Sequence, residues 1–257
     1  MVSFVRTLKR KCIKALSIIK YLLSQYRRDR IKLSSYGISR VVFFKVRQWK
    51  FNKEKMRTRV YYKAIRNGEK CFVKIGKSDG ALKNEINIYK YLKQCNIKFV
   101  PQYLISEESY DNDRILLVLQ YLEGVNKFKT PKTEDEFNHI CNEFEAIHAC
   151  FCKFGILQRD ISITNIYMNN ENKMVVTDFG MGVSPGSDVS LIDPESNVGT
   201  YFIFTEKTRI YDDAYSFVRM LDECGIPSEY KEMECYRRIE KLVGIHTHSL
   251  VIKADSD

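Results

Sequence analysis

Three polar residues near the middle of the chain have the types and the spacing of a metal-dependent transfer site. Asp160 ends a Gln-Arg-Asp stretch, Asn165 follows five positions later, and Asp178 begins an Asp-Phe-Gly stretch. A carboxylate such as that of Asp160 can orient a hydroxyl group and accept its proton. The side-chain oxygens of Asn165 and Asp178 are hard ligands that suit Mg²⁺. Together they could combine a proton acceptor with a divalent-cation site.

The order of these motifs resembles the signature of the protein-kinase-like superfamily. In that family a catalytic loop H-R-D-x-x-x-x-N precedes a hairpin and then D-F-G. Here the interval between the two aspartates holds two apolar-rich segments around a turn at residues 169–172. The resemblance covers roughly residues 40–220 and implies phosphoryl transfer from ATP with Mg²⁺. It makes Asp160 and Arg159 catalytic, gives the metal to Asn165 and Asp178, and lets Gly180 turn the backbone after Asp178.

The nucleotide side of such a site is implied by residues upstream. Lys74 lies in Phe-Val-Lys-Ile, which resembles the family's phosphate-holding lysine, and a lysine within an apolar strand needs a partner. Glu85 on the next predicted helix is the expected partner, although it could also be an ordinary surface charge. The segment with Gln120, Leu122 and Glu123 resembles the hinge that meets adenine, and Glu123 could equally be a plain solvated carboxylate.

Downstream, one aspartate is expected to support the catalytic loop. Asp213 begins Asp-Ala-Tyr-Ser-Phe, which resembles the start of the helix whose aspartate braces the catalytic-loop backbone in kinases. Asp213 is therefore expected to be structural, with Asp212 as a possible substitute.

Hydrophobic periodicity predicts the elements around these residues. The turn Asn67-Gly68 between two strand-like runs is a strong hairpin signal, and residues 183–197 have the composition of a mobile loop. Predicted strands cover residues 41–48, 58–66, 70–75 and 114–121, and predicted helices cover residues 3–28, 81–94 and 134–154.

This order of elements indicates an α+β protein. We expect a two-lobed, protein-kinase-like fold with a small antiparallel β N-lobe and a short, mainly helical C-lobe. The expected parts are a basic N-terminal helix over residues 1–32, an N-lobe over residues 33–125 and a C-lobe over residues 126–257.

The positive charge of the chain is concentrated at its front. Residues 1–60 hold 18 lysines and arginines against two acidic residues, whereas the rest holds 24 basic and 30 acidic residues. No run of about 18 uncharged apolar residues exists, so we expect no membrane-spanning helix. A basic amphipathic helix over residues 1–32 predicts contact with an anionic membrane surface, or else it packs on its own domain. No nucleic-acid-binding module is recognisable, so nucleic acid is not an expected partner.

Several features depart from ordinary protein kinases. Residues 49–57, between the first two strands, contain no glycine, so the glycine-rich loop is missing. Gln158 replaces the catalytic-loop histidine, Ser162 stands where a lysine is usual, and only about 40 residues follow Asp213. These departures resemble the small bacterial sugar and lipopolysaccharide-core kinases. That resemblance implies a glycan or glycolipid acceptor and a cytoplasmic location, peripheral to the inner face of the cell membrane.

Two alternatives remain open. A protein Ser/Thr kinase is favoured by Arg159 and by the Asp-Phe-Gly stretch, and opposed by Ser162. A pseudokinase that binds a partner without catalysis is favoured by the missing glycine loop, although Lys74, Asp160 and the two metal-ligand candidates are all present.

Overall fold

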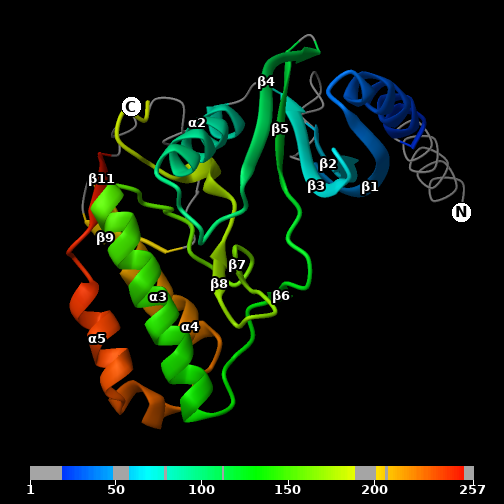
Figure 1. Cartoon of the computed structure of the whole chain (residues 1–257). Helices are drawn as coiled ribbons and strands as arrows, with labels where there is room; N and C mark the ends of the chain where they lie inside the picture. Colours follow the sequence, from blue (N-terminus) through cyan, green and yellow to red (C-terminus); the bar gives the residue numbers. More distant parts are fainter. Residues whose placement is uncertain are drawn as a thin grey trace, which may run out of the picture. The chain divides into compact units, whose positions relative to one another are not determined.

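The computed structural model describes residues 19–48, 58–77, 80–111, 113–188, 201–205 and 208–251 (Figure 1). The chain forms two compact units, Met1–Lys74 and Ile75–Asp257. The lobe boundaries expected after residues 32 and 125 stay predictions. The small antiparallel sheet and the several helices confirm the α+β class.

The first unit is a helix followed by antiparallel strands. Residues 19–34 are helical, β1 covers Ile38–Gln48, β2 covers Thr58–Arg66, and β3 covers Glu69–Lys77. β1 and β2 pair from Ile38 opposite Arg66 to Gln48 opposite Thr58. Both turn residues between β2 and β3 have positive φ, 52° at Asn67 and 85° at Gly68. This is the geometry of the two-residue hairpin that the Asn-Gly pair predicts.

The second unit contains the remaining elements. Its helices are α2 (Gly80–Gln94), α3 (Glu134–Phe154), α4 (Asp213–Glu223) and α5 (Glu234–Leu242), with 3₁₀ turns η1 (Phe179–Met181) and η3 (Ser228–Glu232). Its strands are β4 (Tyr103–Asp111), β5 (Arg114–Gln120), β6 (Asn126–Lys127), β7 (Ile166–Met168), β8 (Met174–Val176), β9 (Ile203–Thr205), β10 (Thr208–Asp212) and β11 (Thr247–Val251).

Helix α3 is the central element of the second unit's core. Thr133 caps its first turn by accepting a hydrogen bond from the Glu136 backbone N–H at 3.2 Å, and Gly155 ends it at φ 63°. Its buried side, which includes Phe137, Phe144 and Phe151, joins one apolar cluster with residues of α2, β5, β8, α4 and α5. Figure 1 shows α3, α4 and α5 side by side.

Several predicted boundaries need correction. The described part of the first helix continues to residue 34, beyond the predicted end at 28, and ends just before Gly37, whose φ is 71°. β1 begins three residues before its predicted start, at Ile38. β4 was not predicted, because a Ser-Glu-Glu-Ser stretch interrupts its apolar pattern. Residues 1–18, the segment 49–57 and residues 189–197 of the predicted mobile loop lie outside the described residues.

Candidate active site

A short hairpin in the second unit separates the two motifs. β7 and β8 pair antiparallel, with Ile166 opposite Val176 and Met168 opposite Met174. The side-chain oxygen of Asn169 accepts hydrogen bonds from the backbone N–H of Glu171 at 2.9 Å and of Lys173 at 2.8 Å, which closes the turn. This is the hairpin that the apolar segments on either side of residues 169–172 predict.

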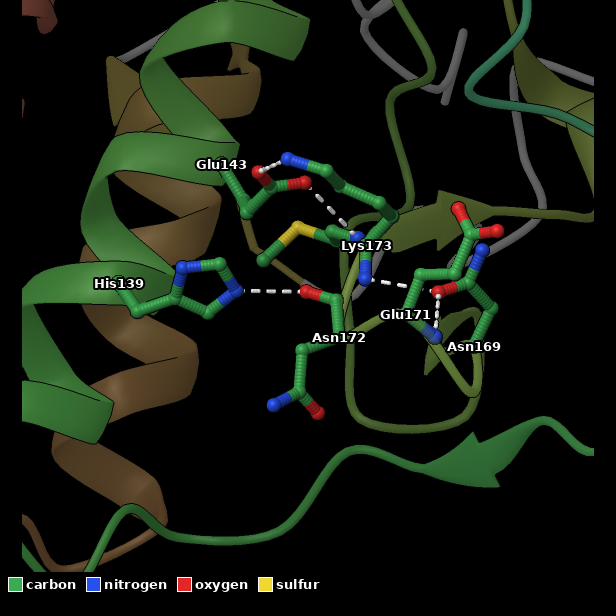
Figure 2. A network of polar contacts seen from close by, with 7 residues as sticks. His139, Glu143, Asn169, Glu171, Asn172 and Lys173 are labelled. Atoms are coloured by element: carbon green, nitrogen blue, oxygen red, sulfur yellow. Dashed lines mark hydrogen bonds and ion pairs between the residues drawn. The ribbon is translucent and has the colours of Figure 1, made fainter.

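Helix α3 holds this hairpin from one side (Figure 2). The Glu143 carboxylate accepts from Lys173 Nζ at 2.8 Å and from the Met174 backbone N–H at 3.1 Å. The His139 ring bonds the Asn172 carbonyl at 2.6 Å. Because Glu143 is buried, its bond to a backbone N–H is less exposed to water than a surface ion pair is. The hairpin therefore has a fixed position on the core helix.

Asn165 is tied directly to Asp160. Its side-chain N–H₂ donates to the Asp160 backbone carbonyl at 2.9 Å and to the Asp160 carboxylate at 2.8 Å. A carbonyl can only accept, so these bonds fix which end of the Asn165 amide is nitrogen. The amide oxygen accepts a long hydrogen bond from the Thr164 hydroxyl at 3.4 Å and is left for other contacts. The Asn165 backbone carbonyl also accepts from the Thr177 N–H at 2.9 Å, which places Asn165 beside the Asp178 loop.

The side chain of Gln158 connects the Asp160 loop to the Asp178 loop. Its amide oxygen accepts from the Asp160 backbone N–H at 2.7 Å. Its amide nitrogen donates to the carbonyls of Thr177 and Asp178, both at 3.1 Å. Gln158 itself is fully buried, and the three residues that it bonds are partly buried. The residue that departs from the kinase pattern thus joins both motifs.

Asp213 braces the same loop from the start of α4. Its two carboxylate oxygens accept from the backbone N–H groups of Gln158 at 2.7 Å and of Arg159 at 2.9 Å. Asp212 has a different role, because it caps α4 at the Tyr215 N–H and also accepts from Gly244. Burial raises the pKa of Asp213 to about 7, against the two backbone N–H groups, which lower it.

Arg159 is buried rather than presented to a substrate. Only 2% of it is exposed, and its guanidinium lies 3.9 Å from the centre of the Tyr211 ring. Cation–π contacts of this kind are strongest when they are shielded from water. The geometry gives no support to the expected catalytic contact by Arg159 and instead favours a positioning role.

Two backbone positions in the site are strained. Arg159 has φ 66° and Asp178 has φ 60°, both in the left-handed region. Aspartate tolerates this region better than most residues do, whereas arginine does not. Such positions cost about 1–3 kcal/mol each and persist where neighbouring contacts hold them. The Asp213 carboxylate supplies that contact at the Arg159 N–H.

The Asp-Phe-Gly segment is fixed by α2. Phe179 is buried and meets the rings of Tyr89 and Phe151 edge-on, at centroid distances of 5.5 and 6.0 Å. Asn84 donates to the carbonyls of Gly180 and Gly182 at 3.2 and 2.8 Å. Burial raises the pKa of Tyr89 well above its usual value, and the nearby carboxylates of Glu85 and Asp178 raise it further.

The expected reason for Gly180 needs correction. The left-handed turn is made by Asp178 itself, and a Cβ at Gly180 would come no closer than 3.5 Å to any neighbour. The tight glycine is Gly182, where a Cβ would lie 3.0 Å from Ile88 and 3.1 Å from the Leu157 carbonyl. Gly180 supports the site through its carbonyl, which Asn84 holds.

The hinge candidates lie next to the hairpin. Gln120 ends β5. Leu122, which is half-buried, and Glu123, which is exposed, follow it. A Cβ at Gly124 would lie 2.1 Å from the Asn170 side chain, so this backbone runs against the hairpin turn. β6, just after it, pairs with β7. The second unit therefore gathers the hinge candidates, Asp160, Asn165, Asp178 and Asp213.

Lys74 and Glu85 are each buried within an element. Lys74 lies in β3 and is 8% exposed, and Glu85 lies in α2 and is fully buried. Burying a charge without compensation is costly, which agrees with the expectation that each has a partner. Their pairing with one another stays a prediction.

The donor set fits Mg²⁺. Asp178 offers a carboxylate, and Asn165 offers an amide oxygen whose orientation is fixed by its bonds to Asp160. Within the described residues, no three or more His, Cys, Asp or Glu side chains gather to hold a metal ion. Mg²⁺ usually takes one or two carboxylates and completes its shell with waters and substrate phosphates, so two protein ligands suffice.

Comparison with known proteins finds relatives for part of the chain. No family model matches it. It is 26% identical over 141 residues to CBL-interacting protein kinase 16 of Oryza sativa subsp. japonica, covering 49% of this chain and 30% of that protein. It is 30% identical over 101 residues to the serine/threonine-protein kinase YPK3 of Saccharomyces cerevisiae, covering 37% and 19%. A CBL-interacting serine/threonine-protein kinase 24 of Arabidopsis thaliana matches at 26% identity over 118 residues, covering 43% and 25%.

Part of this chain is similar in sequence to protein kinases. The matches cover less than a third of each relative's own length. The kinase-like resemblance of the motifs is therefore supported, and a particular resemblance to bacterial sugar kinases is not.

Sequence reasoning missed two residues that position the kinase-like site. Gln158 was noted only as a departure, yet it makes three hydrogen bonds between the motifs. Asn84 was not singled out at all. The available signal was a polar residue on the apolar side of α2, at a position flanked by the buried Leu82 and Ile86.

Replacing Gln158 tests its linking role. Gln158→Leu removes the bonding partner of the Asp160 N–H and of the carbonyls of Thr177 and Asp178, which lie in partly buried surroundings. We expect it to lower the free energy of unfolding by about 2–4 kcal/mol. Gln94→Leu, at an exposed position of α2, is the matched control and should change stability by less than about 0.5 kcal/mol. Urea denaturation measures both, and equal stability of the two variants would contradict the role.

The raised pKa of Asp213 gives a pH dependence with a definite sign. The unfolded chain ionises near the ordinary value of 3.8, and the folded protein near 7. The folded state therefore holds this proton more tightly, and the contribution of Asp213 to stability is present below about pH 4 and lost as the pH rises through 7. Relative to Asp213→Asn, the wild type should lose stability across this range in urea unfolding. A difference that stays constant or grows would refute the assignment.

Proposed function

We propose that this protein is a phosphotransferase that moves the γ-phosphoryl group of ATP to a hydroxyl. The observation that carries the proposal is the side chain of Gln158, which holds the loops of Asp160 and Asp178 together. Phosphoryl transfer depends mainly on positioning and on electrostatic stabilisation. Hydrogen bonds from one side chain to the loops of the candidate base and the candidate metal ligand meet that requirement, because they hold the two loops together.

Each residue has a defined task in this proposal. Asp160 receives or orients the proton of the acceptor hydroxyl, and Asn165 holds the Asp160 carboxylate in place. Asp178 and the Asn165 amide oxygen would hold Mg²⁺, which neutralises charge on the nucleotide phosphates. From the motif resemblance we also propose ATP-binding roles for Lys74, for its predicted partner Glu85, and for the hinge segment with Gln120, Leu122 and Glu123. Asp213 and Arg159 keep the loop in its strained conformation.

The acceptor is a finer part of the proposal. The basic front of the chain and the absence of glycine from the sequence of residues 49–57 favour an anionic sugar or a lipid-linked glycan as acceptor, with the protein working in the cytoplasm at the inner face of the cell membrane. The named relatives are protein kinases, and this favours a second candidate, a protein Ser/Thr kinase. A pseudokinase role is disfavoured, because Asp160, Asn165 and Asp178 are all present and positioned.

Substitution of the two aspartates tests the activity. We expect Asp160→Asn and Asp178→Asn each to lower the rate of γ-phosphate transfer from Mg-ATP by about a hundredfold or more. Asp113→Asn, in the exposed turn between β4 and β5, should leave the rate unchanged. Labelled γ-phosphate offered with a bacterial glycolipid extract, and separately with a serine-rich protein, reports the acceptor. Transfer only to protein would select the second candidate, and full activity in both aspartate variants would refute the proposal.

A further inference from the structure

The helix of residues 19–34 turns an unusual face toward its own sheet. Its buried positions include the polar residues Gln25 and Asp29 together with Leu33. Asp29 is fully buried and accepts a hydrogen bond from the Tyr62 hydroxyl at 2.7 Å. Tyr26 donates from its hydroxyl to the Val41 carbonyl at 2.7 Å. The helix is thus held on the strands in large part by polar contacts.

The opposite face carries the apolar residues that a packed helix would normally bury. Ile19 is 52% exposed, Leu23 is 56% exposed and Ile31 is 74% exposed. Ile19 and Leu23 are four positions apart, and Ile31 lies eight positions after Leu23 with Arg27 between them. These three apolar residues therefore follow one side of the helix together with Arg27. Single apolar residues scattered over a surface are normal, whereas apolar residues aligned with basic residues on one exposed helix side are typical of a helix that lies on a membrane surface.

Basic residues accompany these apolar residues. A hollow on the helix is lined by Lys20, Leu23, Ser24, Arg27, Arg28 and Ile31. Residues 19–34 contain five lysines and arginines, and their single acidic residue is the buried Asp29.

We infer that this face, which we call the basic–apolar face (Ile19, Lys20, Leu23, Arg27, Arg28 and Ile31), docks on an anionic lipid bilayer. Leu23 and Ile31 enter the boundary between headgroups and acyl chains, and the flanking arginines meet lipid phosphates. A second copy of the chain fits poorly, since it would bring like charges together. Nucleic acid would use the basic residues but would leave the apolar residues in water. Among the described residues, no helix is long and apolar enough to cross a membrane, and surface docking requires none.

Vesicle sedimentation with the full chain tests this inference. The probes are phosphatidylcholine vesicles with and without phosphatidylglycerol. We expect binding to the anionic vesicles only, weakening as salt rises. Each basic residue near such a surface contributes about 1 kcal/mol, so Arg27→Glu with Arg28→Glu should weaken binding by about thirtyfold or more. Leu23→Ser with Ile31→Ser should weaken it without changing the charge.

Two control variants show whether binding depends on this face in particular. Lys127→Glu with Lys129→Glu makes the same change in net charge at exposed positions of the second unit and should bind vesicles as the wild type does. Asp160→Asn should also bind normally, because docking does not rest on the proposed transfer activity. Circular dichroism checks that each variant is folded.

Four results would overturn the inference. Equal binding to neutral and anionic vesicles would show that lipid charge does not drive the binding. Equal binding by the Arg27/Arg28 variant and by the Lys127/Lys129 control would show that the basic–apolar face is not the binding site. A wild type that ignores vesicles but binds nucleic acid, or that forms a dimer abolished by Leu23→Ser with Ile31→Ser, would assign the face to that other partner.

Discussion

The candidate site depends on how Gln158 is held and on what it holds. Its backbone N–H is fixed by Asp213, and its side chain then reaches the Asp160 N–H on one side and two carbonyls of the Asp178 loop on the other. An amide side chain can donate and accept at the same time without a change of charge. In a fully buried position this joins two loops with every polar group satisfied, whereas an unpaired polar group there would be costly. The strained backbone at Arg159 and Asp178 persists within this frame.

The surrounding elements keep the frame in place. Helix α3 fixes the β7–β8 hairpin through Glu143, and α2 fixes the Asp-Phe-Gly segment through Asn84 and Tyr89. Both helices contribute residues to one apolar core. The same core therefore supports the candidate base and the candidate metal ligands, which is what a reaction governed by positioning requires. The first unit has a separate feature, a helix whose exposed face is apolar and basic.

Much of this arrangement could be predicted from the sequence. Long periodic segments such as Glu134–Phe154 and a turn as specific as Asn67-Gly68 determine local structure, so α3 and the β2–β3 hairpin were predicted with correct bounds or nearly so. The spacing of Asn165 after Asp160 was enough to predict that the two residues belong to one site. β4 was missed because a polar stretch breaks its pattern. The role of Gln158 was missed because the sequence shows only that it replaces the family's histidine. The backbone groups that its side chain bonds are known only from the structure.

The most direct test of the proposed site asks whether Asn165 and Asp178 hold a metal only together with nucleotide. Paramagnetic relaxation by Mn²⁺, observed by NMR at the Asn165 side-chain amide and the Asp178 backbone amide, measures this with Gln94 as a distant reference. We expect strong broadening of both signals with Mn²⁺ and ATP together, absent in Asp178→Asn. Broadening no greater than that at Gln94 would contradict the assignment of this site to Mg-ATP.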